Sequence, residues 1–416
     1  MGRAHLGGSG LREDRDNAQA PPSRERERTG ARGRSSAERL ILSTIRRRAA
    51  IPSVEIAQEL GISAQTVSTA VRTLEADGLI LRGEPVRGRI GQPSVPLSLD
   101  PDGALFLGAK IGRRSVDIVL ADFTGQVRAR RRKAYDFPTP AEAVDFLCGG
   151  AADLEAELGE RASRLAGLGI AIPSRLWDWI EEIAAPEAWM TAWRDHDMER
   201  AVAARARWPV YVVNDGTAAC AAERVFGDHG AIEDLVYFYI GTFVGGGLVV
   251  RGTLLRGGAG NAGAVASMLV PDGKGGAQQL LNRASLIQLE RALSGGAGEV
   301  PDWERAESWT RDHASVQRWI DAAGRALAHA SLNAAALTEA RAAIIDGPFP
   351  RPVHENLLAA VKRHLAALPS VGITRPAILR GSIGPLSRAL GGASLPLFDL
   401  FETPGAIAPP GPARST

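Results

Sequence analysis

The sequence predicts an α/β protein of two unlike parts, a small helical domain ending in a β-hairpin and a larger body of strands and helices. Three observations predict this fold class. Apolar residues recur at helical spacing in three short segments near the N-terminus. Two short apolar strands around a Gly/Pro/Arg-rich tip come next. From Ala104 onward, short apolar strands alternate with helices, and this alternation runs through two similar rounds.

Length and composition indicate a soluble protein of several domains. A chain of 416 residues exceeds one ordinary core, and 45% hydrophobic with 23% charged residues is typical of globular proteins. The net charge of +2 neither requires nor excludes nucleic acid. Cys148 and Cys220 give no disulfide framework and no zinc spacing, so a reducing cytoplasm is expected. No apolar run approaches the ~18 residues of a membrane helix, and the N-terminus lacks the apolar region of a secretory signal.

Both ends of the chain are predicted to be disordered tails. Residues 1–35 are rich in Gly, Pro, Ser, Arg and Glu, and residues 404–416 in Pro, Gly and Ala. Such segments bury too little apolar surface to offset their loss of conformational entropy.

The small domain is predicted over residues 36–100, with three helices capped by serines. Ser36, Ser53 and Ser63 precede the three apolar-periodic segments, and Gly61 ends the second helix. The residues expected to face inward are Leu40, Ile41, Thr44 and Ile45, then Ile56, Ala57 and Leu60, then Val67, Val71 and Leu74.

The segment from Ser53 to Ile80 is typical of a helix-turn-helix, in which the second helix enters the DNA major groove. Amide, hydroxyl and guanidinium groups on the outer face of that helix suit base edges and phosphates. The alternative is an ordinary solvated face, but three capped helices before a hairpin favour DNA. The predicted DNA-contacting residues are Gln65, Thr66, Ser68, Thr69 and Arg72.

The segment LILRGEPVRGRIGQPSVPLSLD is predicted to form the β-hairpin wing of a winged helix. Arg87 and Arg89 at its tip are predicted to enter a minor groove or pair with phosphate, and solvation is an equal alternative. The arginines at 46–48 are expected to contact DNA backbone or solvent.

The body is predicted as two lobes, residues 101–230 and residues 231–403. Each begins with a β-hairpin that carries glycines at its bend, and strands and helices follow. A short helix is expected at Pro385–Leu390. Two similar rounds predict a duplicated actin-like (ribonuclease H-like) body with a cleft between the lobes.

Five motifs follow one another along the chain, in the order LGAKIGRRSVDIVLADFTGQV, GLGIAIP, VYVVNDGTAACAAE, YIGTFVGGGLVVRGTLLRGGAGNAG and ILRGSIG. With these motifs the chain, from about Ser36 to Leu400, resembles the ROK family (repressors, open reading frames and sugar kinases), in particular its regulator branch with a winged helix-turn-helix before the kinase-like body. The resemblance implies an actin-like ATPase (ASKHA) fold, a homodimer or homotetramer, operator DNA as partner, and a sugar or sugar derivative as effector.

The first glycine loop departs from the kinases that it resembles. They carry an aspartate where this chain has Lys110, and that aspartate helps to place the magnesium of the nucleotide. An ammonium group cannot ligate Mg²⁺, which requires oxygen donors. Lys110 either binds an anion directly or, as we expect, pairs with Asp215 or another acid of the cleft. No cofactor is predicted.

Asn214 and Asp215 follow a strand at the expected cleft, where the resemblance implies sugar-holding and general-base residues. A carboxylate there deprotonates a hydroxyl or accepts hydrogen bonds from it, and we predict ligand binding rather than catalysis. The alternative role for Asp215 is to cap the next helix. Gly245 and Gly246 match the second phosphate loop, with a tight bend at positive φ as the preferred alternative.

Two further positions depart from the family. Ala264 and Ser267 stand where the sugar kinases carry a glutamate and a histidine. The following loop PDGKGGAQQ has no cysteine, and a zinc site needs about four N, S or O ligands, so no metal is predicted. An aromatic cluster follows the motif GLGIAIP and consists of Trp177, Trp179, Trp189 and Trp193. We expect it mainly to pack an irregular insert, and stacking on a ligand is the minority hypothesis.

Together these patterns predict a transcriptional regulator rather than an enzyme, with the body sensing a small molecule. The first alternative is an ATP-dependent sugar kinase with an appended DNA-binding head. Asp215 and the glycine loops support it, whereas the substitutions at Lys110, Ala264 and Ser267 disfavour it. The second alternative is a DNA-binding or scaffold protein without a ligand.

Overall fold

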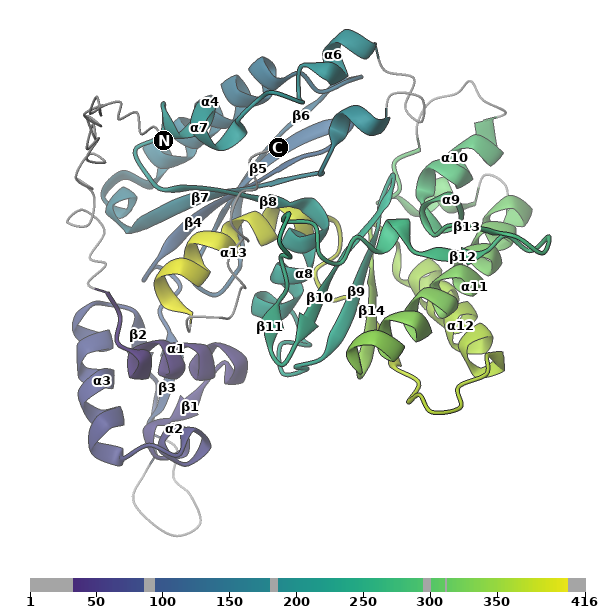
Figure 1. Ribbon diagram of the computed structural model, residues 1–416. Helices are drawn as coiled ribbons and strands as arrows, with labels where there is room; N and C mark the ends of the chain where they lie inside the picture. Colours follow the sequence, from purple (N-terminus) through teal and green to yellow (C-terminus); the bar gives the residue numbers. More distant parts are fainter. Residues whose placement is uncertain (1–32, 86–93, 180–185, 295–300, 311–312, 403–416) are drawn as a thin grey trace, which may run out of the picture.

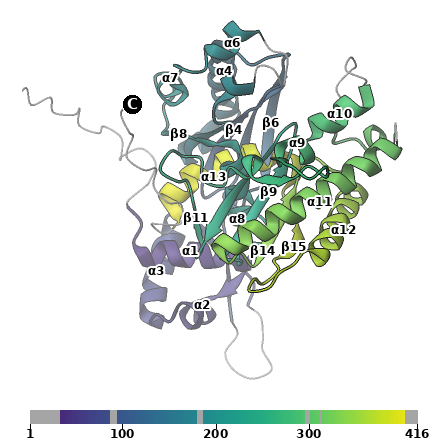
Figure 2. The same ribbon diagram turned by 45° about the vertical axis from the view of Figure 1, so that its right-hand side comes forward.

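The computed structural model describes residues 33–85, 94–179, 186–294, 301–310 and 313–402. Figures 1 and 2 show a small domain, here called the head, below a larger body of two sheets flanked by helices. None of the described helices is long and apolar enough to span a membrane.

The head contains three helices and a three-stranded antiparallel sheet of order β1-β3-β2 (Figure 1). This arrangement agrees with the predicted winged helix, although residues 86–93 at the tip lie outside the described ranges. Its elements are α1 (Ser36–Arg48), β1 (Ile51–Pro52), α2 (Ser53–Leu60), α3 (Ala64–Ala76), β2 (Ile80–Arg82) and β3 (Pro96–Leu99).

Two of the three predicted caps are displaced by one residue. Ser35, not Ser36, caps α1 and forms a reciprocal capping box with Glu38. Ser53 is the first residue of α2, and Pro52 occupies its N-cap without a side-chain hydrogen bond. Ser63 caps α3 as expected by accepting a hydrogen bond from the Thr66 amide.

The predicted inward faces are correct except at one position of α1. Leu40 is 37% exposed, and Leu42 is buried in its place. Gly61 ends α2 in the left-handed region at φ 63°, which glycine adopts without a steric penalty.

The first sheet has the order β6-β5-β4-β7-β8, with an antiparallel meander of three strands followed by two strands parallel to β4. The elements of this round are β4 (Leu105–Ile111), β5 (Ser115–Ala121), β6 (Val127–Ala134), α4 (Pro140–Leu158), β7 (Leu165–Ile172), α6 (Glu187–Thr191), α7 (Met198–Ala203), β8 (Val210–Asn214) and α8 (Asp215–Phe226).

The second sheet repeats this topology with the order β11-β10-β9-β14-β15, which confirms the predicted duplication. Its round contains β9 (Leu235–Ile240), β10 (Val244–Val250), β11 (Thr253–Leu254), β12 (Leu269–Pro271), β13 (Ala277–Gln279), α9 (Leu281–Ala284), α10 (Leu286–Ser294), α11 (His313–Thr338), β14 (Ala342–Asp346), α12 (Arg351–Ala367) and β15 (Ala377–Arg380).

The last helix, α13 (Ser387–Phe401), differs from the prediction in length and position. It continues past Leu390 and contains Pro396, which has no amide hydrogen to donate. Its packing partners are α8 and the strands of the first sheet, although the predicted second lobe, residues 231–403, includes it (Figure 1).

Glycines allow α13 to lie directly against the first sheet and α8. A Cβ built on Gly108 of β4 would lie 2.1 Å from the Ala389 carbonyl oxygen, and one on Gly391 would lie 1.8 Å from that of Ala218. Real side chains do not approach backbone so closely, so these positions require glycine.

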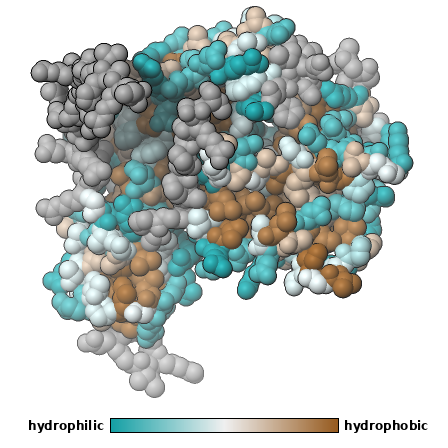
Figure 3. Space-filling model, viewed as in Figure 1, coloured by the Kyte–Doolittle hydropathy of each residue, from teal (hydrophilic) through white to brown (hydrophobic). Residues whose placement is uncertain are grey.

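On the face shown in Figure 3, hydrophilic side chains cover much of the first lobe, while apolar side chains are visible on the second lobe and the head. The exposed large apolar residues of the described chain include Leu269, Leu337 and Val371 in the second lobe and Val54 and Leu81 in the head.

Candidate functional site

The outer face of α3 presents all five predicted DNA-contacting residues to solvent. Val67, Ala70, Val71 and Leu74 are buried on the opposite face and fix the orientation of the helix. The Arg72 Nε donates to the Ser68 carbonyl at 3.3 Å. Arg87 and Arg89 of the wing lie outside the described residues. The exposed residues are Gln65, Thr66, Ser68, Thr69 and Arg72.

Arg46 holds the head to the body, although its sequence context predicted contact with DNA backbone or solvent. Its side chain is only 7% exposed, with Nε 3.5 Å from the Glu402 carboxylate and Nη1 donating to the Phe123 carbonyl at 2.6 Å. The guanidinium carbon lies 4.9 Å from the centre of the Phe123 ring. Burial lowers the pKa of Arg46, and Glu402 opposes this shift.

Apolar packing makes the same connection. Ile41 and Ile45 of α1 belong to one buried cluster with Phe106 of β4 and with Leu397 and Phe401 of α13. Arg39 of α1 also donates to the Glu402 carbonyl at 2.6 Å. The head therefore shares a core with the C-terminal end of α13.

The cleft of the body contains two adjoining chambers. The first, here called the Asn214 chamber, has a volume of about 490 Å³ and brings together all four predicted ligand-binding residues. Those residues are Asn214, Asp215, Gly245 and Gly246.

Asn214, rather than Asp215, caps α8. Its Oδ1 accepts hydrogen bonds from the Gly216 and Thr217 amides, and its Nδ2 donates to Ser174 Oγ at 2.9 Å. The Asp215 carboxylate lies 3.6 Å from Arg388 Nη1 of α13. The cap fixes the start of α8, so both side chains are held at the chamber wall.

Gly245 and Gly246 lie inside β10, and neither has the positive φ that the preferred alternative required. Close packing explains them instead. A Cβ on Gly246 would lie 2.1 Å from the Tyr237 carbonyl oxygen, and one on Gly245 would lie 3.4 Å from the Gly216 Cα. The glycines let β10 pass close to the start of α8.

Ala264 and Ser267 line the Asn214 chamber, so the two departures from the kinase pattern face the same space as Asn214 and Asp215. Two of the four tryptophans pack against other parts of the first lobe. Trp193 is buried and donates to the Pro138 carbonyl, while Trp189 packs edge-on against Phe137. Among the described side chains, no three His, Cys, Asp or Glu residues gather to hold a metal ion.

The second chamber, here called the arginine chamber, has a volume of about 480 Å³. It lies between the bends of the two hairpins and α10, and it joins the Asn214 chamber where Arg113, Tyr239, Phe243 and Arg388 line both. The cationic side chains of its wall, most of which sequence reasoning did not single out, are Lys110, Arg113, Arg114, Arg130, Arg132 and Arg388.

Lys110 pairs with Asp117, and Asp215 pairs with Arg388 instead. Asp117 is the residue directly opposite Lys110 across the β4–β5 hairpin, 3.1 Å from its Nζ. Burial lowers the pKa of Lys110 to about 8, with a contribution from Arg388 that Asp117 partly offsets. Burial alone would raise the pKa of Asp117, but Lys110 and Arg130 outweigh it and hold that pKa low.

Lys110 makes the stability of the protein depend on pH. An unfolded lysine has a pKa of about 10.4, so between pH ~8 and ~10 the unfolded chain binds more protons and the free energy of unfolding rises with pH. We expect Lys110→Met to remove about 2 kcal/mol of that rise between pH ~7 and ~9.5. Urea unfolding of both proteins at the two pH values measures it, and an equal rise in both would contradict the assignment.

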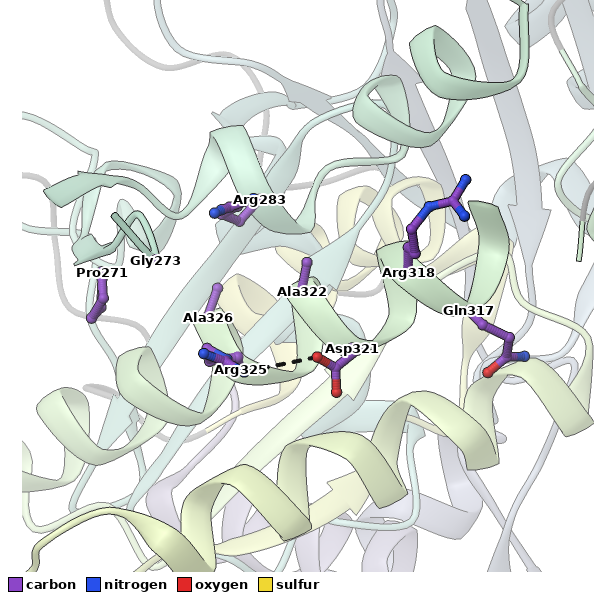
Figure 4. A pocket seen from close by; sticks show the side chains of 9 residues that line it. All are labelled: Pro271, Gly273, Arg283, Gln317, Arg318, Asp321, Ala322, Arg325 and Ala326. Carbon is purple, nitrogen blue, oxygen red and sulfur yellow. Dashed lines mark ion pairs between the residues drawn. The ribbon is translucent and has the colours of Figure 1, made fainter. Parts of the chain in front are cut away.

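A third pocket, of about 430 Å³, lies apart from the cleft, between the β12–β13 hairpin and α11 (Figure 4). Arg283, Arg318 and Arg325 line it, and Arg325 lies 4.0 Å from Asp321. None of the predicted site residues is in its wall.

Comparison with known proteins defines the two parts separately. The profile of the ROK family matches residues 106–367, and a profile described as winged helix-turn-helix DNA-binding matches residues 34–80. The chain is thus a winged-helix protein with a two-lobed kinase-like body. It belongs to the ROK family.

The chain is also similar to individual bacterial proteins. An uncharacterised protein of Sinorhizobium fredii, y4fQ, is 26% identical over 378 residues, 90% of this chain and 94% of the relative. The xylose repressor of Bacillus subtilis is 22% identical over 233 residues, 56% of this chain but only 60% of the repressor.

Two crystal structures share the fold. A ROK family transcriptional regulator, a homologue of the E. coli MLC protein, has a TM-score of 0.62 at 19% identity and covers 88% of this chain and 97% of its own. A ROK family glucokinase from Streptomyces griseus has a TM-score of 0.52 at 20% identity, covering 70% of this chain and 99% of its own.

Proposed function

We propose that this protein is a cytoplasmic DNA-binding transcriptional regulator, in which the head binds operator DNA and the body senses a sugar or a related small molecule. The observation that carries the proposal is the position of α13. Its N-terminal end places Arg388 in both chambers of the cleft, and its C-terminal end packs against α1 beside Glu402.

DNA binding is supported by the exposed polar face of α3 and by the winged-helix match over residues 34–80. Gln65 and Arg72 offer the bidentate hydrogen bonds that read adenine and guanine edges, while Ser68 and Thr69 suit phosphates. In a homodimer or homotetramer, two heads would meet half-sites about one helical turn apart.

A sensing role is supported by what the cleft retains and what it lacks. Asn214 and Asp215 offer hydrogen-bond partners to hydroxyl groups, as sugar recognition requires. Lys110 occupies the place of a magnesium-positioning carboxylate, and Ala264 carries no polar group toward the ligand. We infer that Asp215 binds ligand without serving as the base of a phosphoryl transfer.

The coupling follows from the two ends of α13. A ligand that changes the distance between the lobes acts on Arg388 through Asp215, and α13 transmits the change to α1 through its shared core with the head. A ligand shifts such an equilibrium only by its difference in affinity for the two arrangements, and a few kcal/mol suffices.

The function is tested by measuring binding of the full chain to DNA from upstream of its own gene, with and without a panel of hexoses, N-acetylhexosamines and pentoses. Saturable, sequence-specific binding that one sugar alters supports the proposal. A coupled assay with ATP and the same sugars tests the kinase alternative. Turnover that Asp215→Ala abolishes would overturn the regulator assignment.

Glu402→Ala should uncouple the cleft from the head. The change leaves the guanidinium of Arg46 without its carboxylate in a buried site, at a cost of about 3 kcal/mol. We expect sugar binding to stay within ~2-fold of wild type, while the effect of the sugar on operator affinity, about 1–3 kcal/mol in such systems, largely disappears. Calorimetry with the sugar and fluorescence anisotropy with operator DNA measure the two quantities.

The matched control is Glu307→Ala, which removes the same group from an exposed pair with Arg305. It should leave both quantities unchanged. Full coupling in Glu402→Ala would show that the Arg46–Glu402 pair does not carry the coupling between the cleft and the head.

A further inference from the structure

The arginine chamber concentrates positive charge around one carboxylate. Lys110 Nζ lies 3.1 Å from Asp117, Arg130 Nη2 lies 2.5 Å from it, and Arg132 Nε lies 4.0 Å from it. Arg132 also lies 3.9 Å from Glu304, at the exposed edge of the chamber. Asp117 therefore faces three cations. The wall also contains Glu290, Asp302 and Glu304, and Glu290 lies 2.9 Å from Arg114, so the six cations of the wall face these three acids and Asp117.

Asp117 has little capacity to balance more charge. Its Oδ1 accepts both hydrogen bonds from Arg130, and its Oδ2 lies within 3.3 Å of Ser115 Oγ and 3.1 Å of Lys110. Partly buried cations that outnumber their counter-charges are costly, and an anion in the chamber would lower that cost. The lowered pKa of Lys110 reflects the same crowding, because Arg388 contributes to it.

Two arginines are fixed at the junction of the chambers by aromatic rings. The Arg113 guanidinium carbon lies 4.1 Å from the centre of the Phe243 ring, and that of Arg388 lies 4.7 Å from the centre of the Tyr239 ring. Both arginines line both chambers. A planar guanidinium held in this way is suited to the paired oxygens of a phosphate.

We propose that the arginine chamber binds the phosphate group of a phosphorylated small molecule directly on Lys110, Arg113 and Arg388, without a divalent cation. The inference rests on the proposed function only in taking this molecule as the effector, with its uncharged part in the Asn214 chamber. A phosphomonoester carries close to two negative charges at neutral pH, which suits the cationic excess. A bound Mg²⁺ would instead add positive charge beside Lys110.

The test uses calorimetry on the full chain in EDTA at constant ionic strength, with inorganic phosphate as the first probe. We expect saturable binding with a Kd of about 1 mM or below. Lys110→Met and Arg388→Met should each weaken it at least ~10-fold, as expected for loss of a charge-assisted contact of about 1.4 kcal/mol. Glucose 6-phosphate and ATP, compared with glucose, show whether free phosphate, a sugar phosphate or a nucleotide is the preferred source.

Arg131→Met is the matched control, because Arg131 precedes Arg132 in β6 and pairs with Glu157 outside the chamber. It removes the same charge and should leave phosphate binding unchanged. Arg132→Met, at the chamber edge, provides a second chamber variant if Arg388→Met does not fold. Binding that requires Mg²⁺, or that survives in all the chamber variants, would overturn the proposal. None of these measurements involves DNA, so a failure here is distinct from a failure of the regulator assignment.

Discussion

Gly391→Ala is expected to destabilise the protein by about 3 kcal/mol and to displace α13 from α8. The new methyl group would lie 1.8 Å from the Ala218 carbonyl oxygen, and helix backbone cannot give way as a flexible side chain can. Because α13 also packs against α1 of the head, the variant should lose operator affinity together with stability. Urea unfolding and operator titration measure the two losses.

Gly149→Ala in α4 is the matched control for this change. Gly149 is also helical, but a Cβ there meets no atom within 4 Å. The substitution should stabilise the protein by ~0.5–1 kcal/mol, because alanine loses less backbone entropy than glycine on entering a helix. Equal stability of the two variants would show that α13 is not packed against α8 as described.

Arg72→Ala is expected to weaken operator binding by about 10- to 100-fold, equivalent to 1–3 kcal/mol for a bidentate contact with guanine. Arg72 lies on the exposed face of α3, and its hydrogen bond to the Ser68 carbonyl holds it along the helix without burying it. The fold should not change, since the buried face of α3 is untouched.

Salt dependence separates the two ways in which Arg72 can act. If it reads a base, Arg72→Ala relaxes sequence preference at one position, whereas loss of a phosphate contact weakens all sequences and reduces the salt slope by about 1. Arg207→Ala, which removes an exposed arginine from the first lobe, is the charge-matched control. Wild-type operator affinity in Arg72→Ala would rule out α3 as the recognition helix in this form.

The elements whose sequence pattern is local were predictable from sequence. Helical spacing of apolar residues and a serine-capped third helix defined the helix-turn-helix, because both signals lie within a few residues of each other. The two rounds of hairpin, strand and helix likewise predicted two sheets of the same topology.

Contacts between distant parts of the chain were not predictable in this way. Arg46 reads as one of three arginines at a helix end, and nothing near it indicates Phe123 or Glu402 as its partners. The length of α13 was also missed, because Pro396 favours an earlier helix end in isolation and only packing on the first sheet compensates for it.

The site was predictable in part. Asn214 ends β8 and Asp215 follows it directly. Residues at the ends of adjacent parallel strands meet at one edge of a sheet, so the place of both residues in the cleft follows from topology. The partner of Lys110 depends on the register of the β4–β5 hairpin, which places Asp117 directly opposite. Arg388 reaches the cleft only because α13 returns to the first lobe, and no local pattern carries that information.

The return of α13 also has a consequence for the order in which the molecule assembles. The head is synthesised before either sheet, yet part of the surface against which it packs, Leu397 and Phe401 of α13, is synthesised after both. A nascent chain that has already formed its helix-turn-helix therefore carries an undocked head until α13 leaves the ribosome and inserts against β4 and β7. The packing of the head against α13 is thus completed only in a chain that has been translated through Phe401 and Glu402.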